Sequence, residues 1–168
     1  MAAMKLKILA VVGSTHADSV TRVVVSAVGE ELRKAGCEVD LLDLSQEPLA
    51  LFNPETAYGE PGFAGVKARV EQADVFILGT PDYHGSMSGA LKNFLDHFWR
   101  EFAGKLFATI VASHEKGLTV TDQFVSDSFQ SRLGMLVRDT QVYGGLLAQQ
   151  RRADLAGTDA GFMARLRK

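Results

Sequence analysis

The strongest constraint on the fold is a set of short apolar segments separated by stretches long enough to form helices. Three of these segments, Lys7 to Val12, Val75 to Gly79 and Leu106 to Ala112, are apolar almost throughout. Such segments are typical of strands inside a parallel sheet, because helices cover both faces of that sheet. Two more segments, Glu38 to Leu44 and Gln141 to Leu147, also have strand-like sequences. The first of these two alternates in polarity, which indicates a strand at the edge of the sheet.

The stretches between the strands repeat apolar residues every three to four positions, as amphipathic helices do. The residues that carry this period are Val20, Val23, Val24, Ala27, Val28 and Leu32 in the first helix, Phe63, Val66 and Val70 in the second, Ala90, Leu91, Phe94, Leu95 and Phe98 in the third, Val120, Phe124, Val125 and Leu133 in the fourth, and Phe162 and Leu166 near the end of the chain. Gly36 follows the first helix, at a position where a left-handed residue ends many helices.

Strands that alternate with helices predict an α/β fold, here a three-layer sandwich around a five-stranded parallel sheet. Right-handed crossovers favour the flavodoxin-like strand order 2-1-3-4-5. The sequence contains no internal repeat or linker, so residues 1–168 are expected to form a single domain. In this strand order a ligand binds at the carboxyl ends of the strands, where the first and third strands diverge.

The composition excludes several classes of protein. A formal net charge of -2 provides neither the basic face of a nucleic-acid-binding protein nor the strongly acidic surface of a small electron carrier. Cys37 is the one cysteine, which excludes a disulfide within the chain and an iron–sulfur cluster held by cysteines. The apolar run Ile8 to Val12 is too short for a signal peptide, and no segment reaches the about 20 apolar residues of a membrane span. We therefore expect a cytoplasmic protein that binds neither nucleic acid nor a membrane.

The turn after the first strand is rich in glycine and hydroxyl groups. It reads GSTHADSVT from Gly13 to Thr21 and leads into the first helix. Free N–H groups and the helix dipole favour an anion at a helix start, so this turn can hold a phosphate group. His16 would add a cation or a neutral donor. The alternative is that Asp18 or Ser19 merely caps the helix.

The turn after the third strand suits a flat ring. Pro81 stiffens the exit of the strand, Gly85 and Gly89 permit a close approach of the backbone, and Tyr83 offers an aromatic ring. The alternative is a surface tyrosine beside a glycine that only lets the helix pack closely. Because both turns lie at the same edge of the sheet, together they indicate a nucleotide-like cofactor, and flavin mononucleotide (FMN) fits best.

Two motifs resemble those of the NADPH-dependent FMN reductase family. The run TPDYHGSMSGALKNFLD, residues 80–96, closely resembles the family signature. The turn at residues 13–21 resembles the family's phosphate loop, G-S-x-R-x-x-S-x-T, with His16 in the arginine position. The resemblance extends from the first to the fourth strand. It implies a flavodoxin-like FMN-binding domain that forms a homodimer or a homotetramer, with a third cofactor loop after the fourth strand.

The resemblance assigns cofactor-binding roles to three loops. The residues are Ser14, His16, Ser19, Val20 and Thr21 in the first loop, Pro81, Asp82, Tyr83, His84, Gly85 and Ser86 in the second, and Ser113, His114, Lys116 and Gly117 in the third. No catalytic acid or nucleophile is expected, because in such enzymes the flavin performs the chemistry. No metal site is expected either, because the histidines do not fall in ligand spacing.

The function that the resemblance implies is a ping-pong reaction. NADPH or NADH would pass a hydride to the bound FMN, and a quinone, azo compound, free flavin or similar small-molecule acceptor would then take the electrons. Arg22 is a candidate for holding the phosphate of the nicotinamide nucleotide. Two alternatives stay open: a flavin-binding electron carrier or redox sensor without nicotinamide turnover, and a nucleotide-binding or scaffolding protein without flavin.

Aromatic residues cluster after the third helix. Phe94 and Phe98 fit the buried face of that helix, but Trp99 and Phe102 exceed what one helix face needs. Because aromatic residues are enriched in protein interfaces, this group predicts a contact between subunits.

Overall fold

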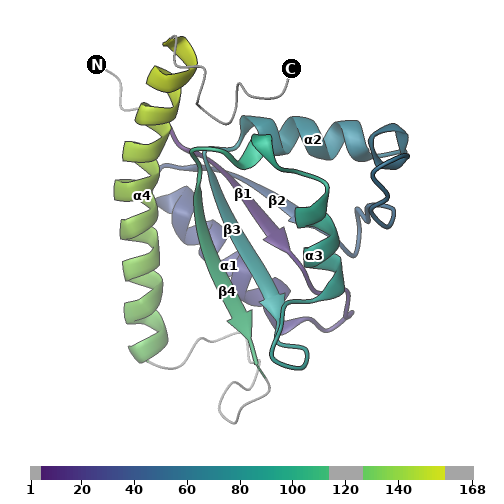
Figure 1. The fold of residues 1–168 in the computed structure, drawn as a ribbon. Helices are drawn as coiled ribbons and strands as arrows, with labels where there is room; N and C mark the ends of the chain where they lie inside the picture. Colours follow the sequence, from purple (N-terminus) through teal and green to yellow (C-terminus); the bar gives the residue numbers. More distant parts are fainter. Residues whose placement is uncertain (1–4, 114–126, 158–168) are drawn as a thin grey trace.

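The central sheet is parallel in the computed structural model, which describes residues 5–113 and 127–157 (Figure 1). The described strands lie in the order β2-β1-β3-β4. The elements in chain order are β1 (Lys7–Val12), α1 (Val20–Lys34), β2 (Glu38–Asp43), the 3-10 helix η1 (Ala57–Gly59), α2 (Phe63–Gln72), β3 (Val75–Pro81), α3 (Gly89–Asp96), the 3-10 helix η2 (Arg100–Phe102), β4 (Leu106–Ala112) and α4 (Asp127–Ala156).

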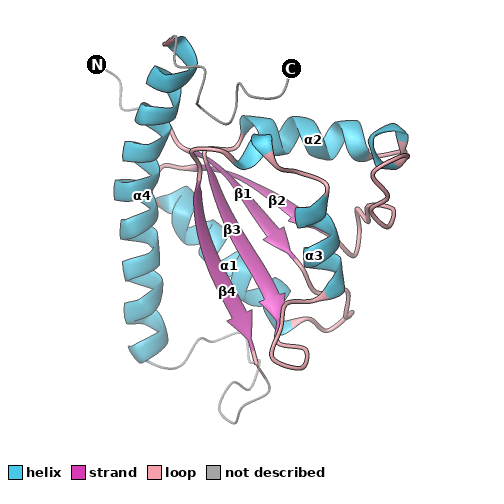
Figure 2. Cartoon of the chain, in the orientation of Figure 1, coloured by secondary structure: helices cyan, strands magenta, loops and turns pink. Residues whose placement is uncertain are grey.

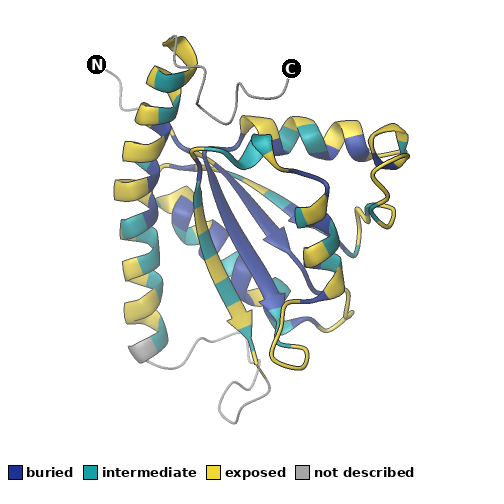
Figure 3. Ribbon diagram, in the orientation of Figure 1, coloured by how far each residue is buried: buried dark blue, intermediate teal, exposed yellow. Residues whose placement is uncertain are grey.

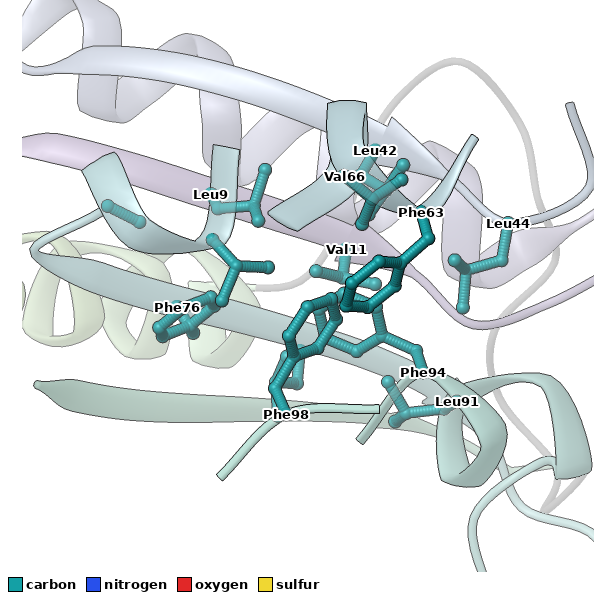
Figure 4. Packing of buried hydrophobic residues seen from close by; sticks show 13 residues of the cluster. Leu9, Val11, Leu42, Leu44, Phe63, Val66, Phe76, Leu91, Phe94 and Phe98 are labelled. Atoms are coloured by element: carbon teal, nitrogen blue, oxygen red, sulfur yellow. The ribbon is translucent and has the colours of Figure 1, made fainter. Parts of the chain in front are cut away.

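Helices cover the sheet on both faces, as the sequence predicts. Helices α2 and α3 lie on one face, where Phe63 and Phe94 pack against strand residues such as Phe76 (Figures 2 and 4). Helices α1 and α4 lie on the other face, where Leu32 and Ala148 contribute to a second core cluster. The flavodoxin-like three-layer architecture is therefore confirmed. Among the described helices none is long and apolar enough to cross a membrane.

The central strands β1 and β3 are buried on both faces, which confirms the prediction for the apolar segments Lys7 to Val12 and Val75 to Gly79 (Figure 3). Strand β2 lies at the edge, also as predicted. The prediction that Leu106 to Ala112 forms a strand covered on both faces was wrong, because the residues of β4 alternate between partial burial and exposure. In the described part of the chain β4 pairs with β3 alone, and Phe107 and Val111 on one of its faces are exposed.

The predicted fifth strand, Gln141 to Leu147, is instead part of α4, so the described sheet has four strands in the order 2-1-3-4. Thr140, Gly144 and Ala148 are buried and lie four residues apart, on one face of the helix. At Gly144 a Cβ atom would lie only 2.8 Å from Val75 Cγ2. The small residues therefore let α4 pack closely on the sheet, and this packing outweighs the strand-like local sequence.

The predicted helices agree with the structure where it describes them. Helix α1 begins after Ser19, and Gly36 follows it with a φ of +91°. The second and third predicted helices correspond to α2 and α3. Of the fourth predicted helix, Leu133 lies in α4, whereas residues 120, 124 and 125 lie outside the described residues, as do residues 162 and 166.

Cys37 is buried in the core, as expected, and burial raises the pKa of its thiol.

Lys105, just before β4, is buried at the edge of the sheet opposite the strands' carboxyl ends. Its ammonium group donates hydrogen bonds to the carbonyl oxygens of Val70 (2.5 Å) and Glu71 (3.0 Å) at the end of α2. Burial and the charge of Arg151 lower the pKa of Lys105 to about 7, although Asp74, Glu71 and Glu101 oppose this shift. The folded protein therefore loses this proton at a lower pH than the unfolded chain.

This difference predicts a pH-dependent stability. Between about pH 7 and the ordinary lysine pKa near 10.4, the unfolded chain holds a proton that the folded protein lacks, so stability rises with pH. Across this window the free energy of unfolding of the wild type should rise relative to that of Lys105→Met, on the order of 3 kcal/mol. Urea unfolding at several pH values measures it. Parallel pH profiles for the two proteins would contradict the prediction.

Candidate cofactor-binding site

The loops that follow β1 and β3 are joined at the carboxyl edge of the sheet. The N–H of Gly13 donates to the carbonyl oxygen of Gly79 at 2.8 Å, one step beyond the last paired residues of the two strands. The hydroxyl of Ser88 donates to the carbonyl oxygen of Gly13 at 2.5 Å, and the Ser88 N–H donates to the hydroxyl of Thr80 at 2.9 Å. The two loops that the sequence assigns to one cofactor therefore lie side by side.

Close packing at the carboxyl ends of β1 and β3 depends on two glycines. A Cβ atom at Gly13 would lie 2.7 Å from the carbonyl oxygen of Gly79 and 2.8 Å from Leu91 Cβ. A Cβ atom at Gly79 would lie 2.3 Å from Val25 Cγ2. No side chain fits at either position without a shift of its neighbours. At Gly89, by contrast, nothing lies within 4 Å of such an atom, so packing among the described residues does not require a glycine there.

The first loop leads into α1 and leaves several hydrogen-bonding groups without a protein partner. Ser19 caps the helix, because its hydroxyl accepts from the N–H of Arg22 at 3.1 Å. The N–H groups of Val20 and Thr21 have no partner among the described residues. Ser14 and Ser19 are buried, and so is Thr21, which is 2% exposed. The start of α1 thus keeps free donors in addition to its cap.

The hydroxyl of Thr21 is the most informative of these groups. The Thr21 hydroxyl has no hydrogen-bond partner in the described part of the chain. Every side-chain oxygen or nitrogen that is fully enclosed there does have a partner, so this hydroxyl is not fully enclosed. The Thr21 hydroxyl must therefore open onto free space beside the first loop, although nearly all of the residue is buried. A hydroxyl held in this way, in a largely buried residue but open on one side, suits a ligand that supplies an acceptor.

His16 is exposed at the outer side of the first loop. Its Nδ1 accepts a hydrogen bond from the N–H of Asp18 at 3.0 Å. An accepting Nδ1 carries no proton, so the ring proton lies on Nε2. In this arrangement His16 offers a neutral Nε2–H donor rather than a cation.

Arg22 supports the first loop from its inner side. Its guanidinium donates to the carbonyl oxygens of His16 (3.1 Å) and Ala17 (2.9 Å) and forms an ion pair with Asp43 (2.5 Å). A further hydrogen bond reaches the hydroxyl of Ser45 at 2.9 Å. Burial alone would raise the pKa of Asp43, but the hydrogen bonds from Arg22 and Ser45 outweigh it and hold this pKa below its ordinary value. Arg22 is committed to these contacts, which makes it a poor candidate for the nicotinamide phosphate.

The second loop is a tight hairpin. Tyr83 and Ser86 exchange backbone hydrogen bonds of 3.0 and 3.2 Å, and between them His84 and Gly85 have φ angles of +57° and +78°. Positive φ at both central residues is the mark of a type I′ turn, which glycine adopts readily and histidine only at a cost. Tyr83 is exposed, as expected of a ring that contacts a ligand.

The two residues before the hairpin fix it to the sheet. Pro81 ends β3, and the N–H of Asp82 donates to the carbonyl oxygen of Ala112 at the end of β4 at 2.8 Å. Ser113 follows β4 at the same edge and is exposed. The other residues assigned to the third loop, His114, Lys116 and Gly117, lie outside the described residues.

Sequence reasoning missed the residues that hold the two loops in place. Ser88 precedes an apolar helix, a position typical of an N-cap, and its hydroxyl does accept from the N–H of Leu91 at 3.1 Å. That local signal could have identified Ser88. The pairing of Arg22 with Asp43, 21 residues away, has no local signal.

The sequence profile of the NADPH-dependent FMN reductase family matches residues 6–146. The chain belongs to this family. An FMN-dependent NADPH-azoreductase of Staphylococcus aureus (strain USA300) is 34% identical over 97 residues, which are 55% of this chain and 52% of that protein. The chain thus spans about half the length of the curated relatives it matches.

Solved structures of other flavin oxidoreductases share the fold of this family member. An NADH:FMN oxidoreductase in its apo form superimposes with a TM-score of 0.64 and 16% identity, covering 82% of this chain and 89% of that one. The NAD(P)H:(acceptor) oxidoreductase of Paracoccus denitrificans superimposes with a TM-score of 0.59 and 16% identity, covering 86% of this chain and 98% of that one. Likenesses at such low identity show the fold alone. Membership of the family confirms the resemblance that the two motifs carry.

The glycine contact between the strands of this FMN reductase family member can be tested directly. Gly13→Ala should lower the free energy of unfolding by about 1–3 kcal/mol, because its Cβ would press on backbone and on Leu91. Gly89→Ala, in the same region with open space around it, should change stability by less than about 0.5 kcal/mol or increase it. Urea unfolding of both variants measures the difference, and equal losses would show that crowding at Gly13 is not the constraint.

Proposed function

We propose that this protein is an FMN-dependent NAD(P)H oxidoreductase that reduces small molecules such as quinones, azo compounds or free flavins. The observation that carries the proposal is the hydroxyl of Thr21 at the start of α1, which has no partner among the described residues and opens from a largely buried residue onto free space, beside a loop that resembles the family's phosphate motif. The hydrogen bonds of Ser88 and Gly13 fix this loop next to the hairpin at Tyr83. One elongated ligand can therefore reach both loops.

The first loop would hold the phosphate of FMN. The N–H groups of Val20 and Thr21, the Thr21 hydroxyl and the Nε2–H of His16 are all neutral donors, and the start of α1 adds the favourable end of the helix dipole. Ser14 and Ser19 line the same loop with their hydroxyls. Arg22 holds the loop in shape through its backbone carbonyls and leaves the phosphate to these groups.

The second loop would support the ring system. Tyr83 offers an aromatic side chain, and the type I′ turn at His84 and Gly85 holds the backbone of residues 82–86 in one shape. When bound, FMN supplies the redox chemistry by accepting a hydride from NAD(P)H and passing electrons to the acceptor. In this proposal the protein's task is to bind and orient the flavin.

Nicotinamide and acceptor would use one open site in turn, in a ping-pong mechanism. Residues 83–87 are all exposed, so the surface beside the hairpin is accessible. Relatives of this chain are named as an azoreductase and as an NAD(P)H:(acceptor) oxidoreductase, and these names support a small-molecule acceptor. A homodimer or homotetramer remains part of the proposal.

The role of Thr21 predicts a loss of FMN affinity. Thr21→Val keeps the shape of the side chain and removes the hydroxyl, so the affinity for FMN should fall at least about tenfold, because a hydrogen bond to a charged group contributes roughly 1.5–3 kcal/mol. Thr15→Val is the matched control, because Thr15 is exposed in the same loop. Removal of the Thr15 hydroxyl should change the affinity for FMN by less than about twofold. Calorimetric titration of FMN into flavin-free protein measures both. Equal affinities for Thr21→Val and the wild type would remove Thr21 from the site.

Turnover distinguishes the enzyme from a flavin-binding carrier. Anaerobic NADPH should bleach the visible band of the FMN-loaded protein, and a quinone should restore it. Steady-state rates at several quinone concentrations should give parallel double-reciprocal lines, as expected when the two substrates bind in turn. A flavin band that NADPH leaves unchanged would favour the electron carrier or sensor, and protein that stays colourless with excess FMN would overturn the proposal.

A further inference from the structure

A cavity lies away from the candidate flavin site, between α2, the segment around η1 and the carboxyl end of α3. Its volume is about 890 Å³, within the range of small-molecule binding sites. Helix α3 runs between the two places: its start at Ser88 belongs to the loop contacts of the flavin site, and its end at Asp96 lines this cavity. Eight helical residues separate them by about 12 Å.

Half of the residues that line this cavity carry aromatic rings. They are Phe52, Tyr58, Phe63, His97, Phe98 and Trp99. Phe63 and Phe98 are stacked, with centroids 5.7 Å apart and planes within 12°, and Figure 4 shows the two rings side by side. Tyr58 meets Phe63 edge to face at 5.4 Å. Such a wall favours another flat ring, which gains apolar burial and ring–ring contacts.

His97 supplies one directed polar group within this wall. The residue is 4% exposed, and its Nδ1 lies 2.7 Å from the carbonyl oxygen of Asn93. A carbonyl only accepts, so Nδ1 carries the proton and Nε2 is left as an acceptor. Nε2 has no hydrogen-bond partner among the described residues. Every fully enclosed polar side-chain atom among those residues does have a partner, so Nε2 is not fully enclosed. It therefore opens onto the cavity that His97 lines.

The charged residues at the cavity have partners within the protein. Lys67 pairs with Glu71 at 2.9 Å and Asp96 with Lys92 at 2.5 Å. Arg100 and Glu101, the other two charged residues of the lining, lie 3.5 Å from each other. No unpaired charge of either sign is left for a ligand, which favours an uncharged molecule.

We propose that this cavity binds a neutral, flat aromatic molecule with a single hydrogen-bond donor, a phenol or naphthol, whose O–H donates to Nε2 of His97. The site is separate from the flavin site and does not depend on the proposed reductase activity. Both the aromatic wall and the lone acceptor are needed for this assignment: the rings select the flat body of the ligand, and Nε2 selects the donor.

The test compares two ligands that differ in the donor alone. 2-Naphthol should bind the FMN-saturated wild-type protein with one site, measured by calorimetry, and 2-methoxynaphthalene, which lacks the O–H, should bind at least about tenfold more weakly. His97→Phe keeps a ring and removes the acceptor, so it should abolish this preference. The ligand comparison needs no variant, so it remains decisive if His97→Phe does not fold.

Three results would overturn the proposal. Equal affinities for naphthol and its methyl ether would show that Nε2 is not the acceptor. Competition between naphthol and FMN would place the ligand in the flavin site. Absence of binding, with sedimentation showing a dimer that Trp99→Glu dissociates, would show that a second copy of the chain covers the cavity. Failure to bind FMN would overturn the proposed function and leave this test intact.

Discussion

The backbone contact between the ends of β1 and β3 is the constraint on which the candidate site depends. One hydrogen bond joins Gly13 to Gly79. A side chain at Gly13 would press on the Gly79 carbonyl oxygen and Leu91, and one at Gly79 would press on Val25 and Thr21 of α1. Ser88 extends this contact, because its hydroxyl donates to Gly13 and accepts from the first turn of α3. The loop before α1 and the loop before α3 are therefore anchored to the same point, and neither can shift without the other.

The cation that contacts the first loop, Arg22, is balanced by a carboxylate on a neighbouring strand. The family motif has an arginine where this chain has His16, and the guanidinium that contacts the loop comes instead from Arg22 in α1. Its charge is balanced by Asp43, on β2. In the proposed function, recognition of the phosphate would fall to N–H and O–H groups at the start of α1, which would bind it without the desolvation of an additional cation.

The sequence predicts those parts of the fold and site that local patterns determine. The apolar runs of β1 and β3, the cap at Ser19 and the turn glycine Gly85 each act through a few neighbouring residues. The prediction of a fifth strand was wrong. Val142 and Tyr143 favour a strand locally, but the small residues Thr140, Gly144 and Ala148 determine a helix through their contact with the sheet. The pairing of Arg22 with Asp43 likewise depends on the strand order, which no local pattern encodes.

Strand β4 shows that an apolar sequence does not by itself fix a central position. Its Phe107 stacks on Phe76, but Val111 is 61% exposed, on a strand that pairs with β3 alone among the described residues. Ala112 accepts a hydrogen bond from Asp82, so Val111 and Tyr83 each lie one residue from the connection between β4 and the second loop. Val111 thus adds one exposed apolar side chain close to the connection with the second loop. An uncharged acceptor would lose less hydration beside such a side chain than a highly charged one, which fits the small-molecule acceptors of the proposed function.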